Sequence, residues 1–550
     1  MENSFKILLF CLIGVTPKIS GEDFQLPEVQ TPFGIVKGFY KTATNGQVFT
    51  AYEGIPYALP PTGKYRFEAP RPLVPWKGTW IANQTTKCIQ YDHLPDQEFR
   101  KVDGEEDCLY LYIYTPKNID SNAALDVIVH IHGGAFMFGA GHFWGPEYLL
   151  EKNVIFINFN YRVGPFGFLS TEDDIVPGNN GLKDQAVALK WIFENIKYFG
   201  GNPESITLTG LSAGGASVTY HYMSQWSAGL FNRGIAVSGS ALNPWAFAEN
   251  SLEKANFLAA NVGCDVDTIE QMVKCLKRRP AYQIAKAVEF FMGYMYNPFS
   301  PFGPVVEKAG HNPFLSQEPL EILQQGKVQD LPLIISMTKD EGLYPAAEFT
   351  SDPKILQEID EKWNELAPHI LDYNYTVPKD QRESFAQEIR EKYLNGETIS
   401  KETFPKFLQI VSDRLFGATL EETAKLFAKA MKSRVYFYYF NYTAPVSFSQ
   451  LMPSDGEIHG VSHADDMLYI TKYHGVETKF DEFDQMKELM TNLWINFAKT
   501  GDVKFGDFEP ERLDVNLNGE FNYLDVESPT KLTMKTAKTL ANYDFWINYK

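Results

Sequence analysis

The sequence predicts a strand followed by a sharp turn at residues 205–214, Ser205-Ile206-Thr207-Leu208-Thr209-Gly210-Leu211-Ser212-Ala213-Gly214. The first five of these residues are rich in β-branched side chains, as strands are, and residues 215–223 read as a helix. A G-x-S-x-G pentapeptide between a strand and a helix is typical of a strained turn that lifts the serine hydroxyl above a sheet. We therefore predict that Ser212 is a nucleophile and that the amino end of the helix favours negative charge beside it.

The sequence on either side of this turn alternates strands with helices. Nearly continuous apolar runs are typical of strands that are covered on both faces of a parallel sheet. Such runs occur at 125–132, 154–159, 234–238 and 331–335. Residues 181–196 carry apolar side chains at helical spacing. The expected fold class is α/β, with a mostly parallel central sheet, helices on both faces and a large helical insertion at about 345–430 over the carboxyl edge.

A glycine pair follows the strand at 125–132, in His132-Gly133-Gly134-Ala135-Phe136. Acyl transfer creates an oxyanion, and backbone N–H groups that no side chain obstructs are well suited to bind it. Consecutive glycines allow such a close approach, as in the HGGG-type loop of esterases and lipases. We predict that the oxyanion donors are the amides of Gly133, Gly134 and Ala213.

A serine nucleophile needs a base, and the base needs a carboxylate that orients it. In this kind of fold the acid follows the serine in the chain and the histidine follows the acid. The loop-like segment 455–466 holds His459 and His463, and the end of a strand is followed by Asp340 and Glu341. Spacing alone leaves both choices open.

Acidic side chains dominate the charge of the 550 residues, since 69 Asp and Glu against 50 Lys and Arg give −19 at pH 7. A surface of that sign repels phosphate backbones, so we expect no nucleic-acid partner. Hydrophobic residues at 44% and charged residues at 22% are typical of a globular chain.

The N-terminus carries a short apolar run at residues 7–15. A bilayer span needs roughly 20 apolar residues, so this run predicts a signal peptide over residues 1–21, cleaved near Ser20 or Gly21. The C-terminal residues show neither an anchor signal nor a retention signal. We expect a secreted protein with no membrane anchor, whose residues 22–550 form one domain.

Removing the signal peptide leaves an even number of cysteines, as an oxidising compartment favours. Three pairings are open to Cys88, Cys108, Cys264 and Cys275. The N-glycosylation pattern Asn-x-Ser/Thr occurs at Asn83, Asn374 and Asn441.

With these motifs in place, the chain resembles the type-B carboxylesterase/cholinesterase family of α/β-hydrolases over nearly its whole mature length. The segment from Phe199 to Gly214 looks like the serine signature of that family, and Glu106-Asp107-Cys108-Leu109-Tyr110-Leu111 is similar to its second signature. Further matching segments are Tyr52–Ala58, Asn160–Gly164 and Gly178–Gln185.

The resemblance implies roles that spacing left open. Ser212 would be the nucleophile, Glu341 the acid and His463 the base of a two-step acyl transfer to water. The disulfides would be local, Cys88–Cys108 and Cys264–Cys275. The substrate would be a small-molecule ester, with no metal and no cofactor.

Departures from the family pattern bear on the substrate. Leu211 replaces the glutamate that many members carry before the serine, and the loop from Cys88 to Cys108 contains no Trp to hold a quaternary ammonium. Acetylcholine is therefore disfavoured, and the serine motif most resembles insect general carboxylesterases, which suggests xenobiotic, odorant or lipid-like esters. Phe299 and Phe302 resemble the acyl-pocket segment of the family, although core packing explains them equally well.

Two alternatives stay open at this point. A juvenile-hormone esterase or a lipase-like member is one, although juvenile-hormone esterases usually carry Gln where Leu211 stands. A non-catalytic adhesion-type relative is the other, but such proteins usually lose the nucleophile and carry an anchor.

Overall fold

The computed structural model describes most of the chain. It covers residues 26–92, 102–308, 310–473, 476, 478, 480–505, 508–516 and 519–547. The predicted signal peptide lies outside the described residues.

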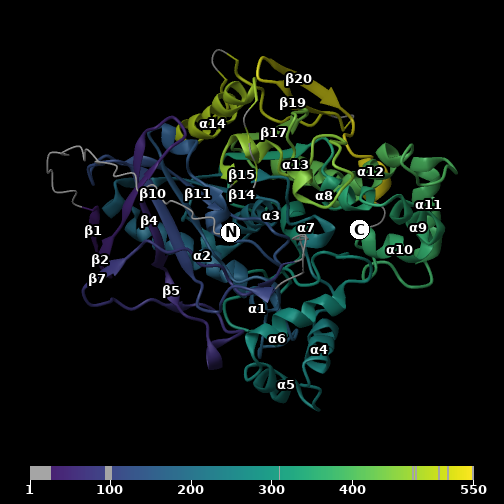
Figure 1. Ribbon diagram of the computed structural model, residues 1–550, viewed down its shortest axis with the longest axis horizontal. Helices are drawn as coiled ribbons and strands as arrows, with labels where there is room; N and C mark the ends of the chain where they lie inside the picture. The colour runs from purple at the N-terminus through teal and green to yellow at the C-terminus, as the bar shows by residue number, and fades with distance from the viewer. Residues whose placement is uncertain are drawn as a thin grey trace, which may run out of the picture.

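An 11-stranded sheet forms the centre of the molecule (Figure 1). Neighbouring strands from β13 through β11, β14, β15, β16 and β17 to β19 run parallel. Antiparallel strands extend the sheet at both edges. In spatial order the strands are β20 (Lys531–Ala537), β19 (Phe521–Ser528), β17 (Val435–Phe440), β16 (Leu333–Thr338), β15 (Arg233–Val237), β14 (Gly201–Leu211), β11 (Leu125–Ile131), β13 (Ile155–Phe159), β10 (Tyr110–Pro116), β4 (Val48–Pro56) and β3 (Phe39–Thr42). The predicted mostly parallel sheet is confirmed.

Helices cover both faces of this sheet because its central strands are apolar on both sides. Along β11, Val127 and Val129 pack into one core cluster, whereas Ile128 between them packs into the other. The first cluster includes α2 (Asn180–Asn195), α3 (Ala213–Met223) and α13 (Ala418–Ala430), and the second includes α14 (Phe483–Thr500). The period of two in side-chain direction thus explains the uninterrupted apolar runs.

The predicted helical insertion is present and lies at one end of the molecule (Figure 1). It comprises α8 (Leu343–Ala346), α9 (Pro353–Glu361), α10 (Trp363–Ile370), α11 (Arg382–Leu394) and α12 (Phe404–Ser412), and continues into α13. Its last helix departs from the prediction, because α13 packs against β16 and β17 rather than over the carboxyl edge. Within the described ranges, no helix is both long enough and apolar enough to cross a bilayer.

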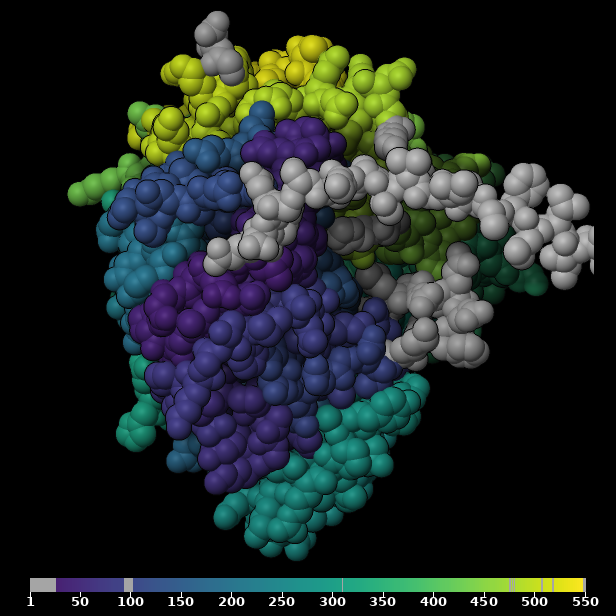
Figure 2. Space-filling model, turned by 60° about the vertical axis from the view of Figure 1, so that its left-hand side comes forward, coloured from purple at the N-terminus to yellow at the C-terminus, as the bar shows by residue number. Residues whose placement is uncertain are grey.

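A second helical lobe was not foreseen from the sequence. It contains α4 (Ser251–Asn261), α5 (Ile269–Leu276) and α6 (Ala281–Lys286). Figure 2 shows it in teal at the bottom of the molecule, below the purple and blue N-terminal part, with the yellow C-terminal part at the top. The Cys264–Cys275 disulfide lies in this lobe, with its Cα atoms 5.6 Å apart. The other disulfide, Cys88–Cys108, has a Cα separation of 4.9 Å, so the local pairing is the one that the structure contains.

The remaining elements are short. They are the sheet of β1 (Glu28–Thr31), β2 (Gly34–Lys37) and β7 (Thr79–Ile81), the pairs β5 (Ala58–Leu59) with β6 (Arg71–Pro72), β8 (Gln90–Tyr91) with β9 (Val102–Asp103) and β12 (Trp144–Gly145) with β18 (Lys472–Tyr473), and helices α1 (Gly164–Phe168), α7 (Pro319–Gln324) and α15 (Tyr543–Trp546).

His130 of β11 makes the stability of the fold depend on pH. Its ring lies among Trp144, Phe156 and Trp494 at centroid distances of 6.4, 6.3 and 6.1 Å, and burial lowers its pKa to about 3. An unfolded chain binds a proton at His130 near the ordinary pKa of about 6.5. Between those two values the unfolded state therefore binds more protons, and stability falls as the pH falls.

We expect protonation of His130 to lower the melting temperature of the wild-type protein as the pH drops from 6.5 toward 4. In His130→Phe, which keeps an aromatic ring in the same aromatic site, the drop should be shallower. Thermal unfolding across this pH range measures both slopes. Equal slopes would mean that His130 is not a source of the acid sensitivity.

Candidate active site

Ser212 stands on a strained turn between β14 and α3, with φ 59° and ψ −120°. The strand before Ser212 and the helix after it approach too closely to leave room for side chains at Gly210 and Gly214. A Cβ on Gly214 would lie 2.0 Å from the carbonyl oxygen of Ile131, and one on Gly210 would lie 2.3 Å from the backbone of Gly214. Because backbone atoms cannot move aside cheaply, glycine is required at both positions. The turn holds the serine side chain on the wall of a pocket.

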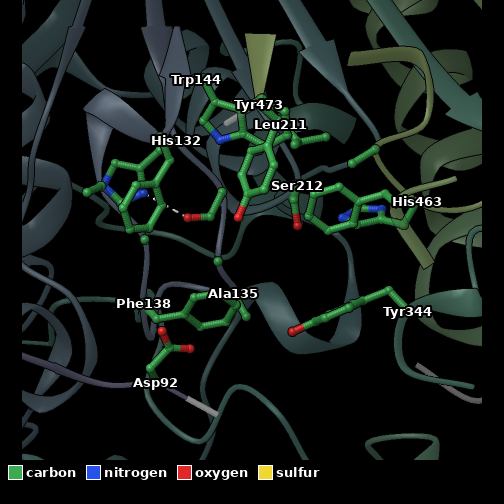
Figure 3. A pocket seen from close by; sticks show the side chains of 17 residues that line it. Asp92, His132, Ala135, Phe138, Trp144, Leu211, Ser212, Tyr344, His463 and Tyr473 are labelled. Atoms are coloured by element: carbon green, nitrogen blue, oxygen red, sulfur yellow. Dashed lines mark hydrogen bonds between the residues drawn. The ribbon is translucent and has the colours of Figure 1, made fainter. Parts of the chain in front are cut away.

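His463 and Glu341 meet beside this turn. The Nδ1 atom of His463 lies 2.6 Å from Oε2 of Glu341, and the two residues are 4% and 0% exposed. The other carboxylate oxygen of Glu341 accepts the backbone N–H of Thr338 at 2.7 Å. A carboxylate only accepts hydrogen bonds, so Nδ1 carries the proton and Nε2 is left as a base. Ser212 and His463 line the same pocket, and Figure 3 shows the two side chains next to each other.

Asp340 and His459, the alternatives that sequence spacing left open, do not form this acid–base pair. Asp340 accepts the N–H of Val461 at 2.9 Å and so supports the loop that carries His463 without touching its ring. His459 pairs with Asp455 at 2.9 Å and does not line the pocket. The structure therefore brings together Glu341 and His463, rather than Asp340 or His459.

Two buried acids after His463 were missed by sequence reasoning, although the pair Asp465-Asp466 stands in the segment that it singled out. Asp465 accepts the N–H groups of Phe448 and Ser462 at 2.6 and 2.7 Å, and burial raises its pKa to about 8. Asp466 accepts the hydroxyl of Tyr438 at 2.7 Å. Its pKa is raised to about 7 by burial, with a further contribution from the charge of Glu341. These contacts fix the loop that positions the imidazole.

The glycine loop after β11 packs directly on the serine turn. A Cβ on Gly133 would lie 2.8 Å from the carbonyl oxygen of Leu211 and 3.0 Å from Cβ of Ser212. Gly134 has φ 101°, a conformation that other residues rarely adopt. Gly133, Gly134 and Ser212 line the pocket together, and Ala213 is fully buried behind them at the start of α3.

The pocket around these residues has mostly apolar walls and is partly open to solvent. One wall is aromatic, since the Trp144 ring lies 6.1 Å from that of Phe448 and 5.0 Å from that of Tyr473. Leu211 lines the pocket beside them (Figure 3). An apolar cavity with few polar groups is typical of a small-molecule site.

Phe299 and Phe302 are both buried, and neither lines this pocket. The Phe299 ring packs on Tyr344 at 5.2 Å, so it supports a pocket residue from behind. Phe302 packs on Phe291 at 4.9 Å. Both side chains therefore pack in the core and do not line the pocket, so the structure favours core packing over an acyl-pocket role for them.

One group of side chains in the described part of the chain has the spacing of metal ligands. Atoms of Asp455, Glu457 and His459 lie within 4.8 Å of one another. The ammonium of Lys401 already pairs with Asp455 at 3.3 Å and with Glu457 at 3.6 Å. Both acids therefore already pair with a protein cation, at a site apart from the pocket.

Comparisons with known proteins agree with this architecture. A model of the carboxylesterase family matches residues 25–546. Venom carboxylesterase-6 of Apis mellifera is 43% identical over 532 residues, which are 96% of this chain and 95% of that protein. Juvenile hormone esterase of Tribolium castaneum is 35% identical over 523 residues, covering 92% of this chain and 87% of its own length.

Among solved structures, juvenile hormone esterase from Manduca sexta, with OTFP covalently attached, matches with a TM-score of 0.83 at 28% identity, covering 96% of this chain and 99% of that one. The chain therefore belongs to the carboxylesterase family, and it is a carboxylic ester hydrolase with the α/β-hydrolase fold.

Proposed function

We propose that the protein hydrolyses carboxylic esters through an acyl-enzyme on Ser212, with His463 as general base and Glu341 as the carboxylate that orients it. The observation that carries this proposal is the 2.6 Å contact between His463 and Glu341 in the pocket that Ser212 lines. A serine hydroxyl is a weak nucleophile by itself, and a base oriented by a third group activates it.

The reaction runs in two steps. Nε2 of His463 takes the Ser212 proton as the hydroxyl oxygen attacks the ester carbonyl, and the proton then passes to the leaving alcohol. Water repeats the sequence on the acyl-enzyme and releases the acid. Glu341 keeps the imidazole in the correct tautomer and stabilises its positive form, and no metal or cofactor takes part.

The amides of Gly133, Gly134 and Ala213 receive the oxyanion in both steps. The packing of Gly133 against Ser212 and the place of Ala213 at the amino end of α3 support this assignment. Loss of one such donor typically costs about 3 to 4 kcal/mol of transition-state stabilisation.

The apolar pocket supports a substrate with apolar groups, in the class of xenobiotic, odorant or lipid-like esters. A juvenile-hormone esterase activity is the second candidate, favoured by the Tribolium relative and the Manduca structure. An adhesion-type protein without activity is disfavoured, because Ser212 and its partners are retained.

We further propose that residues 1–21 are a signal peptide and that residues 22–550 are secreted as one domain. The two disulfides support an oxidising compartment. Asn83 is exposed, and Asn374 and Asn441 are partly exposed, which is compatible with glycans at all three positions.

A fluorophosphonate probe tests the nucleophile. It should add one equivalent of phosphonate to the peptide that carries Ser212, as mass spectrometry would show. Ser212→Ala should not be labelled, whereas Ser384→Ala, at an exposed serine of α11, should be labelled like the wild type. Stoichiometric labelling of Ser212→Ala would overturn the assignment.

A further inference from the structure

Tyr344 presents a polar atom on the wall of the pocket that the mechanism above does not use. The residue lies in α8, three positions after Glu341, and it lines the pocket. Its ring stacks on the imidazole of His463 at a centroid distance of 5.6 Å and an interplanar angle of 27°. The ring of Phe299 packs against it in an edge-type contact, with the ring centroids 5.2 Å apart. The ring is therefore held in one place, and its hydroxyl is held with it.

That hydroxyl is buried without a hydrogen-bond partner. Tyr344 is 5% exposed, and its Oη has no partner among the described residues. Figure 3 shows the hydroxyl directed into the pocket, toward the side where Asp92 and Ala135 lie. Buried hydroxyls are nearly always hydrogen-bonded, and an unpaired one at a binding site marks a place for a ligand atom.

The proton of this hydroxyl is firmly held. Burial raises the pKa of Tyr344 well above its ordinary value, and the nearby charges of Asp92 and Glu348 raise it further. The phenol is therefore a hydrogen-bond donor throughout the pH range in which the enzyme is folded, and the complementary ligand atom is an acceptor.

The two oxygens of a simple ester already have partners in the proposed mechanism. The carbonyl oxygen goes to the amides of Gly133, Gly134 and Ala213, and the leaving oxygen takes its proton from His463. If the substrate supplies the acceptor for Tyr344, that acceptor is therefore an oxygen or nitrogen other than the two ester oxygens.

We propose that Tyr344 Oη donates a hydrogen bond to an additional acceptor atom of the substrate, so that the pocket selects esters that carry an ether, carbonyl or similar oxygen besides the ester group. This inference rests on the proposed function of the site. Tyr344 is a specificity-determining residue, because an ester without that acceptor leaves the buried donor unpaired.

Pairs of esters that differ by one oxygen test the proposal. Three pairs place the acceptor at different positions: 2-methoxyethyl acetate against butyl acetate, 4-nitrophenyl methoxyacetate against 4-nitrophenyl butanoate, and 4-nitrophenyl 4-oxopentanoate against 4-nitrophenyl 4-methylpentanoate. Within a pair, the ratio of kcat/KM for the oxygen-bearing ester to that of its partner is compared between the wild type and Tyr344→Phe. The comparison cancels the intrinsic reactivity of each ester.

Tyr344→Phe keeps the ring on His463 and removes only the hydroxyl. We expect the ratio to fall about tenfold or more in at least one pair, mainly through KM. The melting temperature should not fall, because no partner in the protein is lost. The matched control is Tyr373→Phe: Tyr373 is fully buried, its Oη is also unpaired among the described residues, and it lies outside the pocket. That variant should leave all three ratios unchanged.

An unchanged ratio in every pair, or an equal loss for both members of every pair, would overturn the inference. Dissociation constants of the same esters, measured by calorimetry in Ser212→Ala with and without Tyr344→Phe, provide a readout without turnover. The proposed function fails separately, if Ser212→Ala still hydrolyses the esters at the wild-type rate.

Discussion

Alanine at Ser212, at His463 or at both positions is expected to lower kcat by the same factor, about a million-fold. The two residues act as a unit: the hydroxyl attacks only while the imidazole takes its proton, and the imidazole has no acceptor role without the hydroxyl. Removing the second residue therefore costs little once the first is gone. The residual rate comes from substrate binding and from the oxyanion donors. Hydrolysis of 4-nitrophenyl butanoate at saturating concentration measures the three values.

The matched control is His459→Ala. His459 lies four residues before His463 in the same segment, but its Nε2 bonds to Asp455 and its ring packs against Phe404 at 5.0 Å. This variant should stay within about tenfold of the wild type. Strictly additive losses at Ser212 and His463 would show that the two side chains work independently. A large loss in His459→Ala would contradict the assignment of His463 as the only base.

The serine turn was predictable because its determinants are contiguous. The strand, the two glycines, the serine and the helix all lie between Gly201 and Met223, and each follows a local rule. The central strands were predictable for the same reason, since burial on both faces leaves a continuous apolar run in the sequence. The structure starts β16 at Leu333 rather than at Leu331, in keeping with the missing N–H of Pro332.

The choice of acid was not predictable from spacing. Asp340 and Glu341 are adjacent, and which carboxylate meets the histidine depends on the direction of one side chain as the chain leaves β16. In the structure Asp340 pairs with the backbone of Val461, and Glu341 reaches His463. The family resemblance supplied that choice, because local periodicity contains no information on it.

The aromatic wall of the pocket could not be predicted from the sequence either. Trp144 and Tyr473 are neighbours because β12 pairs with β18, two short strands from distant parts of the chain. Phe448 joins them from a third segment, held by the N–H contact of its backbone with Asp465. Each residue alone reads as an ordinary core aromatic, and only the tertiary fold places the three rings on one wall.

Glu341→Gln should lower kcat/KM by about 10³- to 10⁴-fold while leaving the shape of the site intact. A glutamine side chain can still contact Nδ1 of His463 and the N–H of Thr338, but it carries no charge. It therefore no longer stabilises the imidazolium that forms in the transition state, and its amide can hold the imidazole in the wrong tautomer. Steady-state kinetics with 4-nitrophenyl butanoate measure the loss, and an unchanged melting temperature would separate it from unfolding.

Asp340→Asn is the matched control for the loss of activity in Glu341→Gln. Its side chain is the immediate neighbour of Glu341, and the substitution makes the same change from carboxylate to amide. Asp340 accepts one backbone N–H, from Val461, and an amide oxygen can accept the same bond. The variant should therefore lose less than about tenfold, through a small shift of the loop that carries His463. If Asp340→Asn lost as much activity as Glu341→Gln, the charge beside the imidazole would not be the cause, and the effect would belong to the loop as a whole.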